Sequence, residues 1–166
     1  MLNFFNNQCQ SPPITDPLFG VCDEEDGSIA YISRNDQNKW IATIKNDSQI
    51  ELIFTAIDKC VINDNEYEGR GRCDGMLTSP NLLYLIELKN KKSSWKTDAI
   101  NQLESTIQFL QEAHGDILSK YKHKKAFACN KKARHFQEVD QELNLKFFRK
   151  YKFRIDVQAT IVIVNH

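Results

Sequence analysis

The chain has 166 residues, of which 41% are hydrophobic and 27% charged, a composition typical of a soluble globular domain. No stretch approaches the roughly 18 apolar residues that a membrane span needs. The first seven residues lack the basic and apolar segments of a secretion signal. We therefore expect one domain over residues 1–166, located in the cytoplasm and not attached to a membrane.

The net charge of zero conceals two halves of opposite sign. Residues 1–86 hold 6 basic and 13 acidic side chains, whereas residues 87–154 hold 16 basic and 8 acidic ones. A basic segment attracts phosphate backbones when its charges share one face. Nucleic acid is therefore the first partner to consider, although a protein partner is also compatible with this pattern.

The cysteines are odd in number, and none of them forms a CxxC pair; they are Cys9, Cys22, Cys60, Cys73 and Cys129. This pattern favours reduced, buried thiols over a disulfide framework or a zinc site. The histidines likewise lack metal-ligand spacing, so we expect them to be structural or surface residues.

The first half of the chain reads as strands. Residues 1–18 form an irregular lead-in, because Asn, Gln and two adjacent prolines interrupt any pattern. An acidic turn separates residues 19–22 from 28–33, which predicts a hairpin. Residues 40–44 and 50–57 are rich in β-branched and aromatic residues, and both are expected to be strands.

The middle of the chain predicts two adjacent strands. Residues 72–77 lead into a Ser-Pro-Asn turn, and residues 82–89 then form a nearly continuous apolar run. Such a run is typical of a central strand that is covered on both faces. We therefore expect 72–77 and 82–89 to pair through a tight turn.

The second half changes period. Ala99, Leu103, Ile107 and Leu110 share one helix face, which predicts a helix over 97–113 with Thr97 or Asp98 as its cap. A strand at 125–129, a helical stretch at 136–143 and a strand at 155–164 follow. The predicted class is α/β (α+β), with a central mixed sheet that has an antiparallel N-terminal portion and is flanked by helices.

Three residues in the middle strands carry groups that suit phosphodiester chemistry. Asp74 lies near the start of one strand, and Glu87 lies near the end of the next. Because the hairpin reverses the chain, both carboxylates should reach the same end of the sheet. Glu87 and Lys89 project from one face, since alternate residues of a strand share a face. Carboxylates hold a hard cation such as Mg²⁺, and a lysine beside them can polarise the attacking water.

This pattern, Asp74 followed by Glu87-Leu88-Lys89, resembles the D…ExK core of the PD-(D/E)xK nuclease superfamily, and in particular its small stand-alone bacterial members. Cys73 takes the place of the family's proline. The resemblance implies a restriction-endonuclease-like core and Mg²⁺, with Mn²⁺ as a substitute. It also implies metal ligation by Asp74, Glu87 and the Leu88 carbonyl, water activation by Lys89, and a polar contact from Gln102 on the following helix.

Other residues are weaker candidates. The family often supplies a further glutamate from an N-terminal helix, and no helical glutamate stands out here. The acidic side chains that remain as candidates are Glu24, Glu25, Glu66, Glu68 and Asp58. A basic loop with one aromatic residue follows the site and could track a nucleic-acid backbone and stack a base. Its candidate contacts are Lys91, Lys92, Trp95 and Lys96, and Trp95 has inward packing as its alternative. Arg72, which precedes Asp74, is a further candidate for contact with a phosphate.

Three readings remain open at this point. The first is a metal-dependent nuclease that hydrolyses phosphodiester bonds of DNA or RNA. The second is a catalytically silent member of the same fold, such as an immunity or partner protein in a bacterial defence or toxin system. An unrelated α/β interaction domain is the third reading if Asp74 and Glu87 lie far apart. A dimer is compatible with all three.

Overall fold

The structure is a computed structural model that describes residues 2–165. Its larger sheet has the strand order β4-β5-β6-β7-β8. The strands β4, β5 and β6 pair antiparallel, whereas β6, β7 and β8 pair parallel. This confirms the expected mixed sheet with an antiparallel front portion. The bounds are β4 (Ile53–Ala56), β5 (Gly75–Thr78), β6 (Leu82–Lys89), β7 (His123–Asn130) and β8 (Arg154–Val157).

A second sheet, which the sequence analysis did not predict, has the order β2-β1-β3-β9. The predicted hairpin forms its antiparallel β1–β2 pair, and β9 joins β3 in parallel. The bounds are β1 (Leu18–Cys22), β2 (Tyr31–Ser33), β3 (Ala42–Lys45) and β9 (Thr160–Val162). The fold is therefore a mixed α/β structure built on two sheets.

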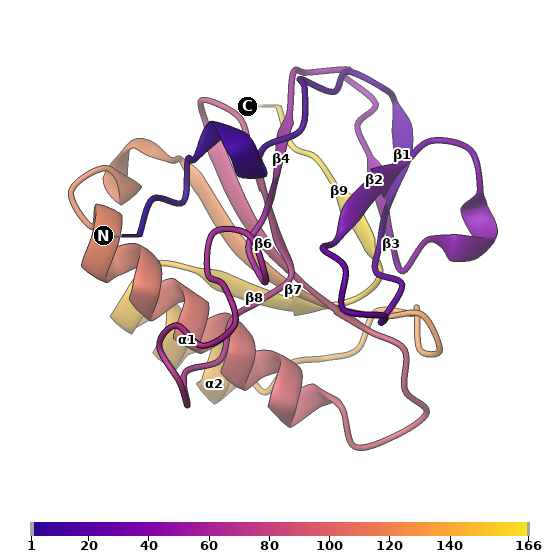
Figure 1. Cartoon of the computed structure of the whole chain (residues 1–166). Coiled ribbons are helices and arrows are strands. Elements are labelled where there is room, and N and C mark those ends of the chain that lie inside the picture. Colours follow the sequence, from indigo (N-terminus) through magenta and orange to yellow (C-terminus); the bar gives the residue numbers. More distant parts are fainter. Residues whose placement is uncertain (1, 166) are drawn as a thin grey trace.

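Two α-helices, α1 (Lys96–His114) and α2 (Gln141–Tyr151), pack on one face of the larger sheet, and the second sheet covers the other face (Figure 1). The helices therefore flank one face of the sheet. Three short 3-10 helices complete the described chain, namely η1 (Asn7–Cys9), η2 (Gln37–Lys39) and η3 (Leu118–Lys120).

Strand β6 lies at the centre and is buried at every position, as its apolar run predicts. Leu83 and Leu85 pack in the core under the helices, whereas Tyr84 and Ile86 pack in the core between the two sheets. This period of two places the next odd-numbered residues of β6 on the helix side.

Two predicted elements have the wrong bounds. The helical stretch expected at 136–143 begins only at Gln141, because Asp140 caps α2 by accepting from the Glu142 amide (3.0 Å). The single strand expected at 155–164 is divided into β8 and β9, which belong to different sheets. The break falls at Gln158, where the chain crosses between the layers. The backbone N–H of Gln158 donates to the Ala128 carbonyl (3.1 Å).

A disulfide joins Cys9 to Cys60, 51 residues apart, so the expectation of reduced thiols is wrong for this pair. Cys22, Cys73 and Cys129 are free and buried, as expected. Disulfides persist mainly in oxidising compartments, so this pair does not favour the cytoplasmic location that the sequence predicts. No helix among residues 2–165 is long and apolar enough to cross a bilayer.

Replacing both bridged cysteines, Cys9→Ser with Cys60→Ser, should lower the free energy of unfolding by roughly 3–4 kcal/mol, because the cross-link restricts a loop of this length in the unfolded chain. Urea unfolding followed by circular dichroism would measure this loss. A reductant should destabilise the wild-type protein by a similar amount and leave the double variant unchanged. Equal stability of the oxidised wild type and the variant would contradict the expectation.

Candidate functional site

The pairing of β5 with β6 sets Asp74 opposite Glu87. Gly75 faces Ile86 in the antiparallel register, and the Asp74 amide donates to the Ile86 carbonyl (3.1 Å). The Leu88 amide in turn donates to Asp74 Oδ2 (2.7 Å). The backbone of β6 thus fixes the Asp74 carboxylate beside that of Glu87, as the hairpin predicted.

Helix α1 supplies the polar cover for this strand end. With its amide nitrogen turned toward Glu87, Gln102 donates to both carboxylate oxygens, at 3.0 Å to Oε1. Lys89 Nζ lies 3.4 Å from Glu87 Oε2 and donates to Asp98 Oδ2 at 2.6 Å. The four predicted residues, Asp74, Glu87, Lys89 and Gln102, therefore lie together in one cluster, which we call the carboxylate cluster.

A short relay ties α1 to the start of β5. Thr106 Oγ1 accepts from the Cys73 amide (2.7 Å) and donates to the Gln102 carbonyl (2.8 Å). The Thr106 side chain therefore contacts both the residue before Asp74 and the turn of α1 that carries Gln102. Gly71 adds to this fit, because a Cβ there would lie 3.3 Å from the Gln102 side chain.

Burial controls the protonation of the two carboxyl groups. Loss of solvent raises the pKa of Asp74 to about 6, while the hydrogen bond from the Leu88 amide opposes this rise. Glu87 exposes only 3% of its surface, and burial, followed by the negative charge of Asp74, raises its pKa well above the usual value. The two groups lie within hydrogen-bonding reach of each other, so Glu87 in its protonated form can donate to ionised Asp74.

Lys89 remains charged in this setting. Burial lowers its pKa, but the hydrogen bond to Asp98 and the charge of Glu87 outweigh burial and raise it overall. Asp98 was expected only as a helix cap; it is instead the ion-pair partner of Lys89, and no side chain caps α1. The i to i+4 spacing of Asp98 and Gln102 on one helix face was a signal that could have revealed this pairing.

The side chain and the backbone of Leu88 have different surroundings. Its side chain packs in the core between the sheets, as expected from the alternation along β6. Its amide is engaged by Asp74, which leaves the neighbouring carbonyl as the atom that the family resemblance assigns to a metal.

The donor set is chemically suited to a hard cation. Two adjacent carboxylates with a backbone carbonyl match the way Mg²⁺ is held, since this ion uses one or two carboxylates and keeps several waters. Among residues 2–165, no group of three or more His, Cys, Asp or Glu side chains is placed to hold an ion.

The further acidic candidates are engaged elsewhere. Glu24 pairs with Lys39 (3.7 Å), and Glu66 accepts from the Asn63 amide (2.9 Å). Glu25 and Glu68 are exposed. Asp58 forms an ion pair with Arg72. The charges of Asp23 and Asp58 both raise the pKa of Asp74, so these two are the outer acidic groups that affect the cluster; Asp23, in the turn after β1, was not predicted.

The weaker nucleic-acid candidates divide into two groups. Arg72 already pairs with both Asp58 and Asp64. Trp95 is buried with 5% exposed, so the inward-packing alternative describes it and its ring is not presented for stacking on a base. Lys91, Lys92 and Lys96 are exposed.

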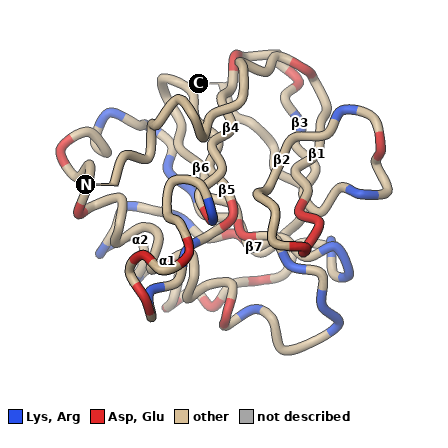
Figure 2. The backbone as a smooth tube through the Cα atoms, viewed as in Figure 1, with Lys and Arg blue, Asp and Glu red and all other residues tan. Residues whose placement is uncertain are grey.

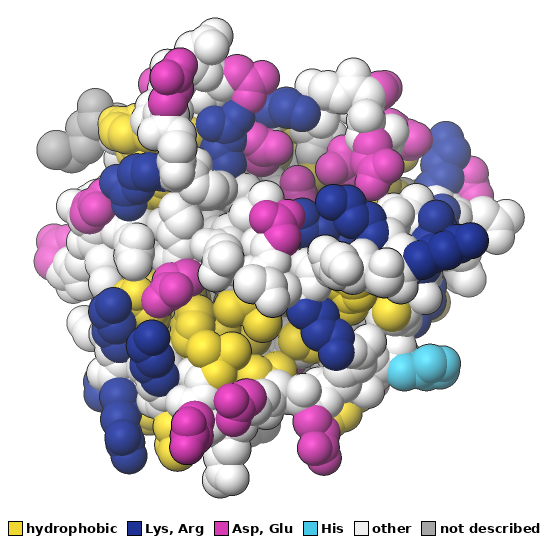
Figure 3. All heavy atoms as spheres, turned by 90° about the horizontal axis from the view of Figure 1, so that it is seen from below, with side chains coloured by type: hydrophobic (Ala, Val, Ile, Leu, Met, Phe, Trp, Pro, Cys, Tyr) yellow, Lys and Arg dark blue, Asp and Glu magenta, His cyan; other side chains and the backbone are white. Residues whose placement is uncertain are grey.

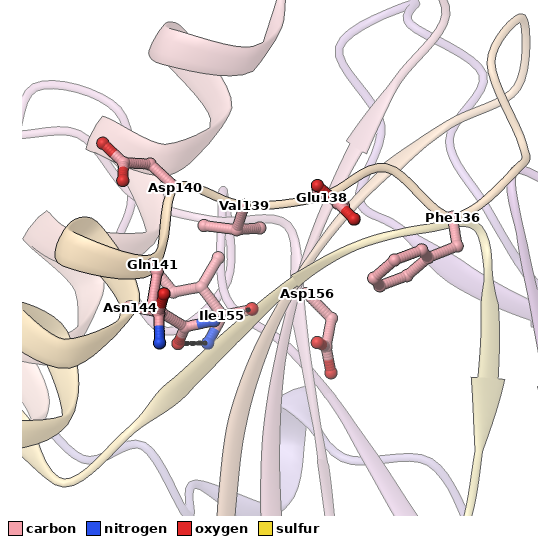
Figure 4. A pocket seen from close by; sticks show the side chains of 8 residues that line it. All are labelled: Phe136, Glu138, Val139, Asp140, Gln141, Asn144, Ile155 and Asp156. Carbon is pink, nitrogen blue, oxygen red and sulfur yellow. Dashed lines mark hydrogen bonds between the residues drawn. The ribbon is translucent and has the colours of Figure 1, made fainter.

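A separate hollow of about 510 Å³ lies between the segment before α2, α2 itself and β8 (Figure 4). Its lining includes Phe136, Val139 and Ile155, with the Asn144 side chain bonded to the Ile155 backbone. Hydrophobic side chains also gather in the middle of the face seen from below, with charged groups of both signs around them (Figure 3). No member of the carboxylate cluster lines the hollow.

Comparisons with models of protein families, with curated proteins and with solved structures found no match to this chain. The fold and the carboxylate cluster are therefore the features that characterise this protein. These define a mixed α/β protein of two sheets and two α-helices, with buried Glu87 and Lys89, half-buried Asp74 and Gln102 together at one end of the central strand.

Asp74→Asn should stabilise the metal-free protein at neutral pH, because asparagine keeps an acceptor for the Leu88 amide and removes the buried charge. Since the folded-state pKa of Asp74 is raised, the wild type loses stability as pH rises from about 4 through about 6. The advantage of the variant should thus grow over this window to roughly 2–3 kcal/mol. Urea unfolding in a chelator at a series of pH values would measure it.

The matched control is Glu138→Gln, which neutralises an exposed carboxylate away from the cluster. It should show no comparable growth with pH. A stability difference between Asp74→Asn and wild type that stays flat from pH 4 to about 7 would show that Asp74 titrates normally.

Proposed function

We propose that this chain is a metal-dependent phosphodiesterase of the PD-(D/E)xK nuclease type that acts on nucleic acid. The observation that carries the proposal is the pairing of Asp74 with Glu87 across β5 and β6, with Lys89 on the same face. The order of three antiparallel strands, a helix and a parallel strand supports it as well, since it places the ExK strand at the centre of the sheet.

Each residue of the cluster has a role in this reaction. Asp74 and Glu87 would hold Mg²⁺ together with the Leu88 carbonyl, and the bound ion would activate water and offset charge on the phosphate. Lys89 would orient the attacking water or stabilise the added negative charge. Gln102 fixes the orientation of the Glu87 carboxylate from α1, as outer-shell hydrogen bonds do in metal sites.

The second candidate function is a catalytically silent binding module, and one observation favours it. Lys89 exposes 8% of its surface and Glu87 exposes 3%. The Lys89 ammonium group already donates a hydrogen bond to Asp98 Oδ2 at 2.6 Å. Substrate would have to displace this ion pair to reach Lys89. The two candidates therefore differ in whether the cluster opens when metal and nucleic acid are present.

Calorimetric titration with Mg²⁺ or Mn²⁺ should show binding by the wild type and none by the Asp74→Ala/Glu87→Ala double variant, because the double variant lacks both carboxylates. A cleavage screen on DNA and RNA should then show that Glu87→Gln lowers the rate roughly 100-fold or more. Glu138→Gln serves as the control and should cleave like wild type.

Cleavage that persists in Glu87→Gln would remove the cluster from the mechanism. Metal binding without cleavage of any substrate would favour the silent module. Absence of both metal binding and cleavage would leave Asp74 and Glu87 as structural residues where β5 and β6 pair. Far-ultraviolet circular dichroism of each variant would confirm that the loss does not come from unfolding.

A further inference from the structure

Two basic loops meet beside the carboxylate cluster, one after β6 and one after β7. Because β6 and β7 run parallel, both loops leave the same end of the sheet. The Lys131 amide donates to the Lys89 carbonyl (2.9 Å), so the second loop begins in direct contact with a member of the cluster. Figure 2 shows Lys and Arg in both loops, at the lower right of the view.

A single buried side chain joins the loops. Asn130 is fully buried, and its Oδ1 accepts from the amides of Lys91 and Lys132, each at 3.1 Å. Its Nδ2 donates to the Lys91 carbonyl (2.7 Å). The backbones of the two loops are therefore held together at fixed spacing, and lysines that are 40 residues apart in sequence become neighbours.

The lysines of these loops form no ion pair among the described residues. The one carboxylate whose pKa responds to them is Asp98, where the hydrogen bond from Lys89 and then the charge of Lys91 lower the pKa. Lys91, Lys92 and Lys132 are exposed and Lys131 is half-buried; we call these four the basic rim. Within the described part of the chain, no carboxylate forms an ion pair with any of them, whereas Lys39 and Lys125 each pair with one carboxylate and Lys89 pairs with two. A group of unneutralised charges on one edge is a site for an anionic ligand.

We propose that the basic rim binds the phosphodiester backbone of a nucleic acid, beside the carboxylate cluster and independently of metal. The inference rests on the proposed function, because that function explains why a nucleic acid would lie beside the carboxylate cluster. Binding by the rim does not itself require catalysis. Point charges on flexible stems contact phosphates without reading bases, so the rim should bind different sequences with similar affinity.

The surroundings of the rim favour nucleic acid over an anionic membrane. Binding to a lipid surface combines basic charge with apolar side chains that enter the headgroup region. The two loops, residues 89–96 and 130–134, contain no large exposed hydrophobic residue of their own, and Ser93 and Ser94 occupy the exposed positions after Lys92. Leu18, from β1, is the exposed apolar side chain that lines a pocket with Lys131. The rim loops thus offer charge without an apolar side chain of their own.

Fluorescence anisotropy with labelled single-stranded DNA, duplex DNA and RNA, in a chelator and at about 50 to 200 mM salt, tests the proposal. Lys91→Glu/Lys132→Glu should weaken binding at least about tenfold and reduce the salt slope by roughly two. The matched control is Lys122→Glu/Lys146→Glu, which makes the same change in charge before β7 and on α2, and it should retain most of the affinity.

Lys91→Gln/Lys132→Gln provides a milder second variant, and thermal unfolding checks that each protein is folded. Equal weakening by the rim and control variants would overturn the proposal, as would wild-type protein that binds no nucleic acid or binds phosphatidylserine vesicles more tightly. Metal calorimetry separates this inference from the proposed function. Rim-dependent binding of nucleic acid by a protein that binds no metal contradicts only the proposed function. Metal binding without rim-dependent binding of nucleic acid contradicts only this inference.

Discussion

Strand β6 is covered on both faces, so the polar groups at its end must find their partners inside the protein. A buried carboxylate is costly unless it is paired or neutralised. Glu87 meets this constraint through Gln102 and Lys89, and through a pKa that burial and the charge of Asp74 raise, which favours its neutral form. The hydrogen bonds of Thr106 to the Cys73 amide and the Gln102 carbonyl connect α1 to the start of β5 beside these partners.

The elements that could be predicted from sequence are those whose signal is local. The apolar run of β6 and the four-residue spacing along α1 depend on burial of one strand and one helix face, and the structure has both at nearly the expected bounds. The second sheet could not be predicted, because its β3–β9 pair joins Thr43 to Thr160. The Cys9–Cys60 disulfide likewise depends on residues brought together by the fold.

The candidate site shows the same division. The opposition of Asp74 and Glu87 followed from a tight turn and the period of a strand, so the sequence contained it. The engagement of Arg72 by Asp58 and Asp64, the inward packing of Trp95 and the Lys89–Asp98 pair depend on loop paths that no local pattern determines. Asn130 had no signal at all, because its role is to satisfy the backbone of another loop.

The parallel β3–β9 pair also has a consequence for how the chain reaches this structure. The second sheet takes three strands from the first 45 residues and its fourth from residues 160–162. Contacts so distant in sequence require closure of a long loop before they contribute any stability, and such contacts slow folding. We therefore expect the parallel β3–β9 pair, which completes the layer over the core between the sheets, to form late in folding.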